Sequence, residues 1–357
     1  DTETNCKHIV AYGMTDKPST DVGDDSTADV SLTDLIGCMK HLDCQQDHVD
    51  VRGFQIKYWL FSNPKKPLGN RFPVVALHGG PSMPHNYILP LKLLADLGYP
   101  VLFYDQCGCG ESKNGIDDPK KNAKLEYLLT VEYYVQELYK VIEGVGLTQY
   151  YVYGSSWGSL LAQEFALTQP SGLLGLILDG TFCCAQEYSQ TQWRDLISTL
   201  PTFSQNKLKQ LVAEKKFDSK GYKAIEEALT PQFTTRLVPH PKCFLDTLKY
   251  SNPAIYQGMQ GPSEFSIGGT LEHWSTVDRL HQVRVPTLVV RGEYDTMTAQ
   301  ASQHVVDLIP TSWPMVTIPR AAHCKLIDEP QACCTEFLKF LTTVDGIREA
   351  CSKPSSD

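Results

Sequence analysis

Several features that would settle the class of a protein are missing from this sequence. No uninterrupted apolar run approaches the roughly 18 residues of a membrane-spanning helix, so we expect no membrane partner. Neither an H-E-x-x-H motif nor a pair of C-x-x-C motifs is present, and we therefore expect no metal and no cofactor. Basic residues are in deficit, with 32 Lys and Arg against 41 Asp and Glu and a formal charge of -9. Such an acidic surface repels phosphate backbones, which argues against a nucleic-acid partner.

Cysteine, by contrast, is abundant, with 12 residues in a chain of 357. The cysteines are scattered, apart from the adjacent pairs Cys183-Cys184 and Cys333-Cys334. We expect buried or half-buried free thiols in preference to a disulfide framework. The chain begins at Asp1 without an apolar leader, which indicates either a removed signal or an internal start. The cysteine content and the missing Met leave secretion open, and the sequence does not indicate an oligomeric state.

Six apolar runs, each followed by a loop that bears Gly, Asp or His, alternate with helical stretches. Two short β-rich runs on either side of Gly53 precede them. This alternation predicts an α/β fold in which helices cover both faces of a largely parallel sheet. In such sheets, functional residues lie on loops at the carboxyl ends of the strands. The six runs span residues 73–80, 99–110, 150–159, 173–180, 285–295 and 314–323.

The domain organisation follows from where this alternation stops. Between the fourth and fifth apolar runs the sequence is helical and polar and lacks convincing strands, which indicates a helical cap inserted into the core. The first residues are polar and uneven in composition, as in an extension. We predict a polar N-terminal extension at 1–46, an α/β core at 47–182 and 270–345, a helical cap at 183–269, and a C-terminal tail at 346–357.

The segment Gly154-Ser155-Ser156-Trp157-Gly158 is a G-x-S-x-G pattern between a predicted strand and a predicted helix. A nucleophile on such a sharp turn has strained backbone dihedrals, and side chains at the flanking glycines would collide. The amino terminus of the following helix supplies main-chain donors and positive potential for a developing oxyanion. A glycine-rich turn without a catalytic role is the plain alternative for the motif alone. In its strand-turn-helix context we predict that Ser156 is a nucleophile.

A serine hydroxyl is inert at neutral pH unless a base lies beside it. Asp295 and His323 each follow a later apolar run, so that the three residues occur in the order Ser, Asp, His. That order is typical of hydrolases whose nucleophile lies on a strand-turn-helix elbow. We therefore predict that His323 is the base and that Asp295 orients it, although a lone Asp or His after a strand is more often structural.

An oxyanion hole needs two main-chain N–H donors. The amide of Trp157, directly after the nucleophile, is predicted to be the first. The second is predicted at Gly80, in His78-Gly79-Gly80-Pro81, because glycine lets the main chain approach a substrate closely. Gly79 in the same loop is predicted to contact the substrate. For this loop alone, a simple turn is the alternative.

With these residues in place, the chain resembles the proline iminopeptidases, a family within the α/β-hydrolases. The pairing of GPSEF with GTLxxW is specific, because general esterases lack it. The resemblance implies an α/β-hydrolase fold with a helical cap over the active site, and cleavage after an unblocked N-terminal residue, often proline. It also favours the cytosol, the usual compartment of the family. The matching pieces run in family order from about residue 48 to 340 and are HGGPSMPHNY, FYDQCGCGES, GSSWGS, MQGPSEFSIGGTLEHW, VPTLVVRGEYD and AAHCKLIDEP.

The resemblance further implies that glutamates of the cap bind the free amino group of the substrate. A buried ammonium needs such paired carboxylates. Glu264, in GPSEF, matches one such position, with a solvated or helix-capping glutamate as the plain alternative. The chain departs from the family where Cys107 replaces an arginine and where Ser82 follows H-G-G-P in place of a glycine. It also reads Pro-His-Pro-Lys at 239–242 in place of an acidic stretch, and the cation of Lys242 would weaken ammonium recognition.

We therefore hypothesise a serine hydrolase that works through an acyl-enzyme and releases an N-terminal residue from short peptides or amino-acid amides. A second hypothesis keeps Ser156, Asp295 and His323 but assigns an ester, a lactone or the amide of a specialised metabolite as substrate. The departures at Ser82 and Lys242 favour this second reading. A third hypothesis, from a different class, is a non-catalytic binding protein on a hydrolase scaffold, against which the presence of all three triad residue types argues.

Overall fold

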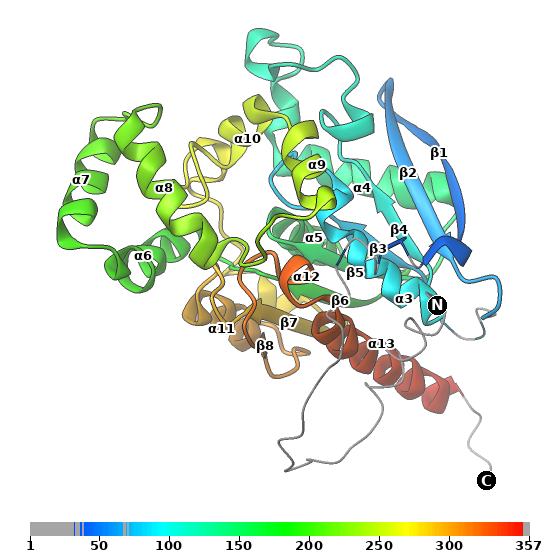
Figure 1. Ribbon diagram of the computed structural model, residues 1–357. Coiled ribbons are helices and arrows are strands. Elements are labelled where there is room, and N and C mark those ends of the chain that lie inside the picture. The colour runs from blue at the N-terminus through cyan, green and yellow to red at the C-terminus, as the bar shows by residue number, and fades with distance from the viewer. Residues whose placement is uncertain (1–31, 33–35, 38, 67–68, 70, 353–357) are drawn as a thin grey trace, which may run out of the picture.

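The computed structural model describes residues 32, 36–37, 39–66, 69 and 71–352. At its centre lies one sheet of eight strands, in the order β1-β2-β4-β3-β5-β6-β7-β8 (Figure 1). β1 and β2 are antiparallel to their neighbours, while β3 to β8 are parallel, which confirms the predicted α/β class. The strands are β1 (Asp43–Val51), β2 (Phe54–Ser62), β3 (Val74–Leu77), β4 (Val101–Tyr104), β5 (Tyr150–Ser155), β6 (Leu173–Asp179), β7 (Thr287–Gly292) and β8 (Val316–Ile318).

The six predicted apolar runs contain the six parallel strands, and alternate residues of each strand face opposite sides of the sheet. Val75 and Val152 belong to one hydrophobic cluster, together with residues of α4, α5 and α11. Their neighbours Val74 and Tyr151 belong to a second cluster, with residues of α3 and α13. Both faces of the sheet are therefore buried at strands β3 to β7, which explains why these strands read as continuous apolar runs.

Helices cover these two faces and also fill the long connection between β6 and β7. The helices of the core are α3 (Lys92–Asp96), α4 (Val131–Val145), α5 (Trp157–Leu167), α11 (Ala299–Leu308), α12 (Lys325–Asp328) and α13 (Pro330–Ser352). Short 3-10 turns are η2 (Met39–His41), η3 (His85–Leu91), η4 (Gly110–Ser112), η5 (Pro119–Lys121), η6 (Glu126–Leu129), η7 (Ile197–Thr199), η8 (Gly269–Leu271) and η9 (Leu280–Gln282). Among the described residues, none of the helices is both long and apolar enough to cross a membrane.

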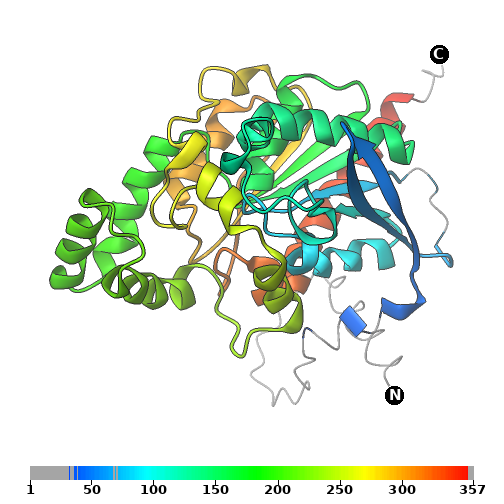
Figure 2. The same cartoon turned by 90° about the horizontal axis from the view of Figure 1, so that it is seen from above.

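The segment between β6 and β7 projects to one side of the sheet with α6, α7 and α8, and returns over it with α9 and α10 (Figures 1 and 2). Within residues 180–286, all of which the structure describes, no strand of the sheet occurs. The outer helices have a hydrophobic cluster of their own, which includes Leu208, Leu229 and Phe265. The five helices are α6 (Ala185–Asp195), α7 (Thr202–Ala213), α8 (Lys220–Phe233), α9 (Lys242–Tyr250) and α10 (Pro253–Met259).

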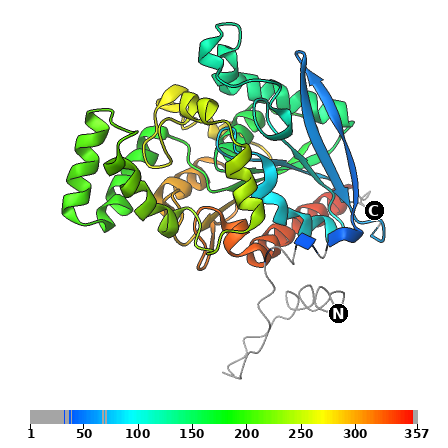
Figure 3. The same ribbon diagram turned by 45° about the horizontal axis from the view of Figure 1, so that its top comes forward.

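The two predicted terminal segments fall largely or partly outside the described residues. Of the extension proposed at 1–46, the described part includes the start of β1, at Asp43. Of the tail proposed at 346–357, residues 346–352 belong to α13, which Figure 3 shows beneath the sheet, and the remainder is not described. Ten cysteines fall within the described chain, and all ten are free thiols.

Asn252 connects the returning cap helices to the core. Its side-chain amide donates to the main-chain oxygens of Gly108 and Ile116, at 2.9 Å each. Its carbonyl oxygen caps α10 by accepting from the amide of Ala254 at 3.1 Å. Because Asn252 is 3% exposed, water cannot replace these partners.

Replacing Asn252 with alanine is therefore expected to lower the free energy of unfolding by about 2–4 kcal/mol, the sum of a lost helix cap and two orphaned buried carbonyls. Urea unfolding of N252A against the parent protein measures this loss. The matched control is N122A, since Asn122 is exposed and its side chain accepts from only the nearby amide of Lys124. Equal midpoints for N252A and N122A would contradict the assignment of Asn252 as a tether.

Candidate active site

Ser156 lies on a sharp turn between β5 and α5, with a φ of 55° and a ψ of -123°. Glycine is required on both sides because there is no space for a side chain. A Cβ on Gly154 would lie 2.2 Å from the main-chain oxygen of Gly158, and a Cβ on Gly158 would lie 2.2 Å from that of Leu77. The G-x-S-x-G spacing therefore encodes the close approach of α5 to β3 and β5.

His323 and Asp295 form a buried pair on the loops that follow β8 and β7. The Nδ1 atom of His323 lies 2.6 Å from the Oδ1 atom of Asp295. The side chains are 8% and 0% exposed, respectively. Burial lowers the pKa of His323, but the charge of Asp295 and its hydrogen bond outweigh this, so the pKa of His323 lies above its ordinary value.

Ser156 and His323 both lie beside the carboxyl end of β6. The amide of Ser156 donates to the main-chain oxygen of Asp179 at 2.9 Å, and a Cβ on Gly180 would lie 3.0 Å from the Cε1 atom of His323. Among the described side chains, no hydrogen bond joins the Ser156 hydroxyl to His323. Such contacts between a nucleophile and its base are commonly long and tighten only in the complex with substrate.

The carboxylate of Asp295 accepts four hydrogen bonds, so both of its oxygens are fixed. Oδ1 accepts from His323 and from the amide of Met297 at 2.9 Å. Oδ2 accepts from the amide of Gly292 at 3.0 Å and from the Nζ atom of Lys325 at 2.8 Å. Burial raises the pKa of Asp295, but the charges of Lys325 and His323 dominate and hold that pKa well below its ordinary value. Asp295 is therefore ionised throughout the neutral range.

Lys325 was not predicted from the sequence, since a lysine two positions after the histidine is usually a solvated residue. It is 1% exposed and lies between Asp295 and Asp179, with its Nζ atom 2.8 Å from an oxygen of each. The only available signal in the sequence was the placement of Asp179 at the end of an apolar run. Burial raises the pKa of Asp179 above its ordinary value, while Lys325 opposes this shift.

The predicted oxyanion donors are Trp157, which directly follows Ser156, and Gly80, which follows Gly79 in the loop after β3. Trp157 is the first residue of α5, where main-chain amides have no partner within the helix. Gly80 has a φ of 114°, in the region that favours glycine. Neither amide donates to an acceptor within the described chain. Gly79 packs directly against Ser156, since a Cβ on it would lie 2.9 Å from the Cβ of Ser156, and its own amide is occupied by the hydroxyl of Tyr87 at 2.8 Å.

Glu264 lies next to the His323–Asp295 pair, at the junction of cap and core. Its Oε1 atom accepts from the hydroxyl of Tyr188 on α6 at 2.7 Å and from that of Thr296 at 3.0 Å. Thr296 directly follows Asp295, and the charge of Glu264 contributes to the raised pKa of His323. No cation of the described chain forms an ion pair with Glu264. A half-buried carboxylate close to the site is thus left without a counter-charge.

The departures from the family pattern have different structural consequences. The hydroxyl of Ser82 donates to the main-chain oxygen of Asn252 at 2.7 Å and so links the His78–Pro81 loop to the cap. Cys107 is buried, and its amide donates to Glu137 at 3.1 Å; burial raises the pKa of Glu137 to about 8. Lys242, which was expected to weaken ammonium recognition, is 78% exposed and forms an ion pair with Asp246.

A second acidic residue of the cap, Glu226 on α8, was also missed by the sequence analysis. Burial raises its pKa, opposed by a hydrogen bond with Ser263, the neighbour of Glu264. The charges of Glu264 and Glu226 both raise the pKa of Tyr256, after the larger effect of its burial. Two carboxylates of the cap therefore lie around Tyr256.

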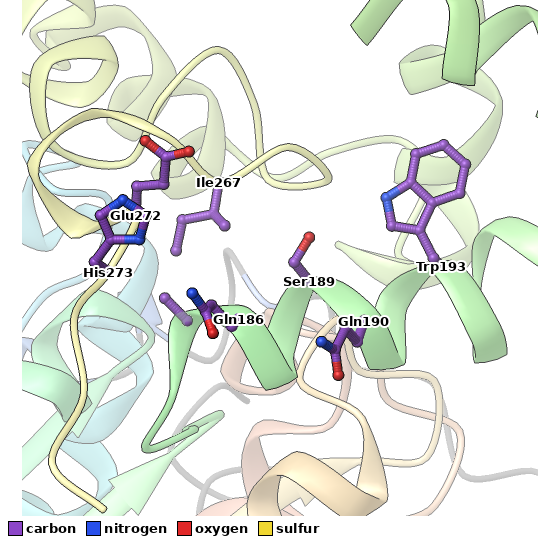
Figure 4. A pocket seen from close by; sticks show the side chains of 8 residues that line it. Gln186, Ser189, Gln190, Trp193, Ile267, Glu272 and His273 are labelled. Carbon is purple, nitrogen blue, oxygen red and sulfur yellow. The ribbon is translucent and has the colours of Figure 1, made fainter. Parts of the chain in front are cut away.

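An open pocket of about 520 Å³ lies beside α6. Figure 4 shows Ser189 and Trp193 of α6 on one side of it and Glu272 and His273 on the other. None of the residues Ser156, Asp295 and His323 lines this pocket. Tyr188 and Gln192, on the adjacent face of α6, bind Glu264 instead.

One group of described residues has the donor types of a metal site. Cys183, Glu187 and His304 bring one ligand atom each to within 4.8 Å of one another. The Nδ1 atom of His304 already lies 2.5 Å from an oxygen of Glu187, and burial raises the pKa of Cys183 to about 12. An ion pair beside a protonated thiol accounts for this group without a metal.

Comparison with known proteins agrees with this geometry. A family model described as the alpha/beta hydrolase fold matches residues 73–330. The chain is 30% identical over 297 residues to a proline iminopeptidase of Heyndrickxia coagulans, covering 83% of this chain and 98% of the relative. A crystal structure of the proline iminopeptidase of Mycobacterium smegmatis superimposes with a TM-score of 0.77 at 31% identity, covering 85% of this chain and 100% of the other. The crystal structure of VinJ superimposes with a TM-score of 0.75 at 29% identity, covering 84% and 99%.

The tight packing around the Ser156 turn leads to a stability prediction. Replacing Gly158 with alanine places a methyl group against the carbonyl of Leu77, which cannot move without disrupting β3. G158A is expected to lower the free energy of unfolding by about 3 kcal/mol. The control is G346A on α13, where the added Cβ would have no neighbouring atom within 4 Å outside its own turn of helix. G346A should raise the free energy of unfolding by about 0.5–1 kcal/mol. Thermal melting of both variants measures the contrast, and a G158A that melts with the parent protein would show that the turn tolerates a side chain.

Proposed function

Because the chain belongs to the α/β-hydrolases and, within them, to the proline iminopeptidases, we propose that it is a serine aminopeptidase. It releases the N-terminal residue, with proline foremost, from short peptides and amino-acid amides. The observation that carries this proposal is the carboxylate of Glu264, which lacks a counter-charge and is bonded to Thr296, the residue next to Asp295. An anion at this place suits a substrate whose free ammonium lies one residue away from the bond that is cleaved.

Ser156 is the nucleophile in this proposal. His323 accepts its proton as the Oγ atom attacks the carbonyl of the N-terminal residue, and the imidazolium that forms is stabilised by Asp295. The bond between His323 and Asp295, at 2.6 Å, fixes the ring so that Nε2 is the atom left for the serine. The raised pKa of His323 strengthens it as a base at neutral pH.

The amides of Trp157 and Gly80 bind the oxyanion of the tetrahedral intermediate. Both lack a competing acceptor in the described chain, which supports this role. His323 then protonates the leaving amine, and the N-terminal residue stays bound to Ser156 as an ester. Water, deprotonated by His323, attacks this ester and releases the free amino acid.

Replacing Ser156 with alanine removes the nucleophile and should lower kcat for prolyl p-nitroanilide by about 10⁴-fold or more, with an unchanged melting temperature. The matched control is S198A, an exposed serine of the cap that should keep full activity. The parent enzyme should prefer the prolyl amide over its N-acetylated form and over p-nitrophenyl acetate. Turnover of the ester alone would contradict the aminopeptidase proposal, and activity in S156A would contradict the nucleophile.

Replacing Glu264 with glutamine removes the charge but keeps an acceptor for Tyr188 and Thr296. We expect kcat/KM for prolyl p-nitroanilide to fall by about 10- to 100-fold, the equivalent of one charge-assisted hydrogen bond, mainly through KM. Turnover of an uncharged ester should change little. E272Q, at an exposed position across α6, serves as the control. An equal loss on charged and uncharged substrates would show that Glu264 acts on the fold and not on the ammonium.

A further inference from the structure

Lys325 carries an ammonium group that is sealed in the core behind the His323–Asp295 pair. Its side chain has no exposed surface. A buried ammonium has three N–H donors to satisfy, and each unsatisfied donor would be costly. The Nζ atom of Lys325 lies 2.8 Å from Asp295 Oδ2, 2.9 Å from the main-chain oxygen of His323 and 2.8 Å from Asp179 Oδ1. The ammonium group therefore donates two hydrogen bonds, to Asp295 and to the main chain of His323, and forms an ion pair with Asp179.

These partners come from the carboxyl ends of three consecutive strands of the sheet. Asp179 is the last residue of β6, Asp295 follows β7, and His323 follows β8. The main chain of Asp179 also binds the amide of Ser156, at 2.9 Å. The ammonium group therefore connects the loop after β7, the loop after β8 and the end of β6, to which the amide of Ser156 is bound.

The ammonium group of Lys325 also has little free space around it. Gly180, with a φ of 63°, packs between the two side chains, since a Cβ on it would lie 3.1 Å from both His323 Nδ1 and Lys325 Nζ. The remaining oxygen of Asp179 accepts from the hydroxyl of Tyr153. The Nζ atom of Lys325 cannot move away without breaking a contact with Asp295 or His323.

We propose that Lys325 is a positioning residue of the reaction, whose ammonium locks the carboxylate of Asp295 in the orientation that holds His323 toward Ser156. This inference rests on the triad of the proposed function and not on the identity of the substrate. Asp179 serves as the anchor that holds the ammonium in place from the opposite side.

The position of the charge also has a predictable effect on His323. A cation near Asp295 weakens the stabilisation of the imidazolium, so Lys325 lowers the pKa of His323 against the larger raising effect of Asp295. Removing Lys325 should therefore raise the pKa of His323, and the reaction that needs neutral His323 should begin at a higher pH. The charged and titratable groups that face this cluster are Asp179, Asp295, His323, Glu264, Tyr87, Tyr153, Tyr188, Arg291, Cys324, Cys333 and Cys334.

The test uses a fluorophosphonate, which reports on Ser156 without a peptide substrate. The Ser156 oxygen forms a bond to phosphorus, fluoride leaves with the electrons of the P–F bond, and His323 takes the hydroxyl proton. The second-order labelling rate is measured from pH 5 to 9 for the full chain and for K325M. We expect labelling by K325M to be about 10- to 100-fold slower, the equivalent of one charge-assisted hydrogen bond, with its acid limb moved to higher pH.

Two further variants separate positioning from charge balance. K325M leaves Asp179 and Asp295 buried without their shared cation, which threatens folding. The double variant D179N/K325M removes both charges of one ion pair and keeps an acceptor for Tyr153. The control is K339M, an exposed lysine of α13 that pairs only with Glu336 and should label at the parent rate.

Slow labelling in a folded D179N/K325M, with the acid limb above that of the parent, supports the inference. If D179N/K325M labels at the parent rate and with the acid limb of the parent, the inference is overturned, because the role of Lys325 would then be only to neutralise Asp179. A parent protein that fails to label would overturn the proposed triad itself, a result distinct from fast labelling by the variants. If the parent labels but does not cleave prolyl amides, the substrate assignment fails and the inference on Lys325 is unaffected.

Discussion

The lack of space between α5 and the strands beneath it is the constraint on which the site depends. Gly154 and Gly158 let the helix pass within contact distance of the carbonyls of β3. That approach forces Ser156 into its positive φ and brings the end of β3, with Gly79 and Gly80, beside the serine. The same packing therefore places Ser156, the proposed nucleophile, against Gly79. The strain at Ser156 is held by the surrounding contacts, among them the bond from its amide to β6.

The buried charges of Asp179, Asp295 and Lys325 lie next to His323, and protonation of His323 in the proposed reaction would offset their net charge. With neutral His323, the buried group of Asp179, Asp295 and Lys325 has one negative charge in excess. Transfer of the serine proton to His323 brings the group to neutrality inside the protein, where an isolated charge would be costly. The environment therefore favours the imidazolium form of His323, which is the form that the transition state of the proposed reaction requires. Glu264 lies outside this balance and has no cation of its own.

The sequence predicted those parts of the fold and site that depend on local pattern. Strands buried on both faces read as apolar runs, and Ser156, Asp295 and His323 could be chosen because each follows such a run in a fixed order. Lys325 could not be chosen, since burial of a lysine becomes favourable only when Asp179 and Asp295 meet it in space, and they lie 325 − 179 = 146 and 325 − 295 = 30 positions before it in the sequence. Tyr188 and Thr296 escaped for the same reason, because only the folded chain brings the cap helix and the β7 loop to one carboxylate. Lys242 was expected to weaken ammonium recognition because it replaces an acidic stretch of the family. In the structure it is exposed and pairs with Asp246, four residues later on α9, as helix geometry favours.

Glu264 is held by residues of both the cap and the core. Tyr188 on α6 and Thr296 beside Asp295 both donate to Oε1, while Oε2 has no hydrogen bond within the described residues. A glutamate side chain normally loses rotamer freedom when it binds a ligand, and here the two hydroxyls have already restricted it. In the proposed function, Oε2 is the oxygen that binds the substrate ammonium. Since the same carboxylate contacts the residue next to the acid of the triad, recognition of the amino group and orientation of His323 are physically connected. An acylated amino terminus carries no positive charge and would leave Oε2 of Glu264 without a cationic partner. The proposed site would distinguish free from acylated peptides in this way.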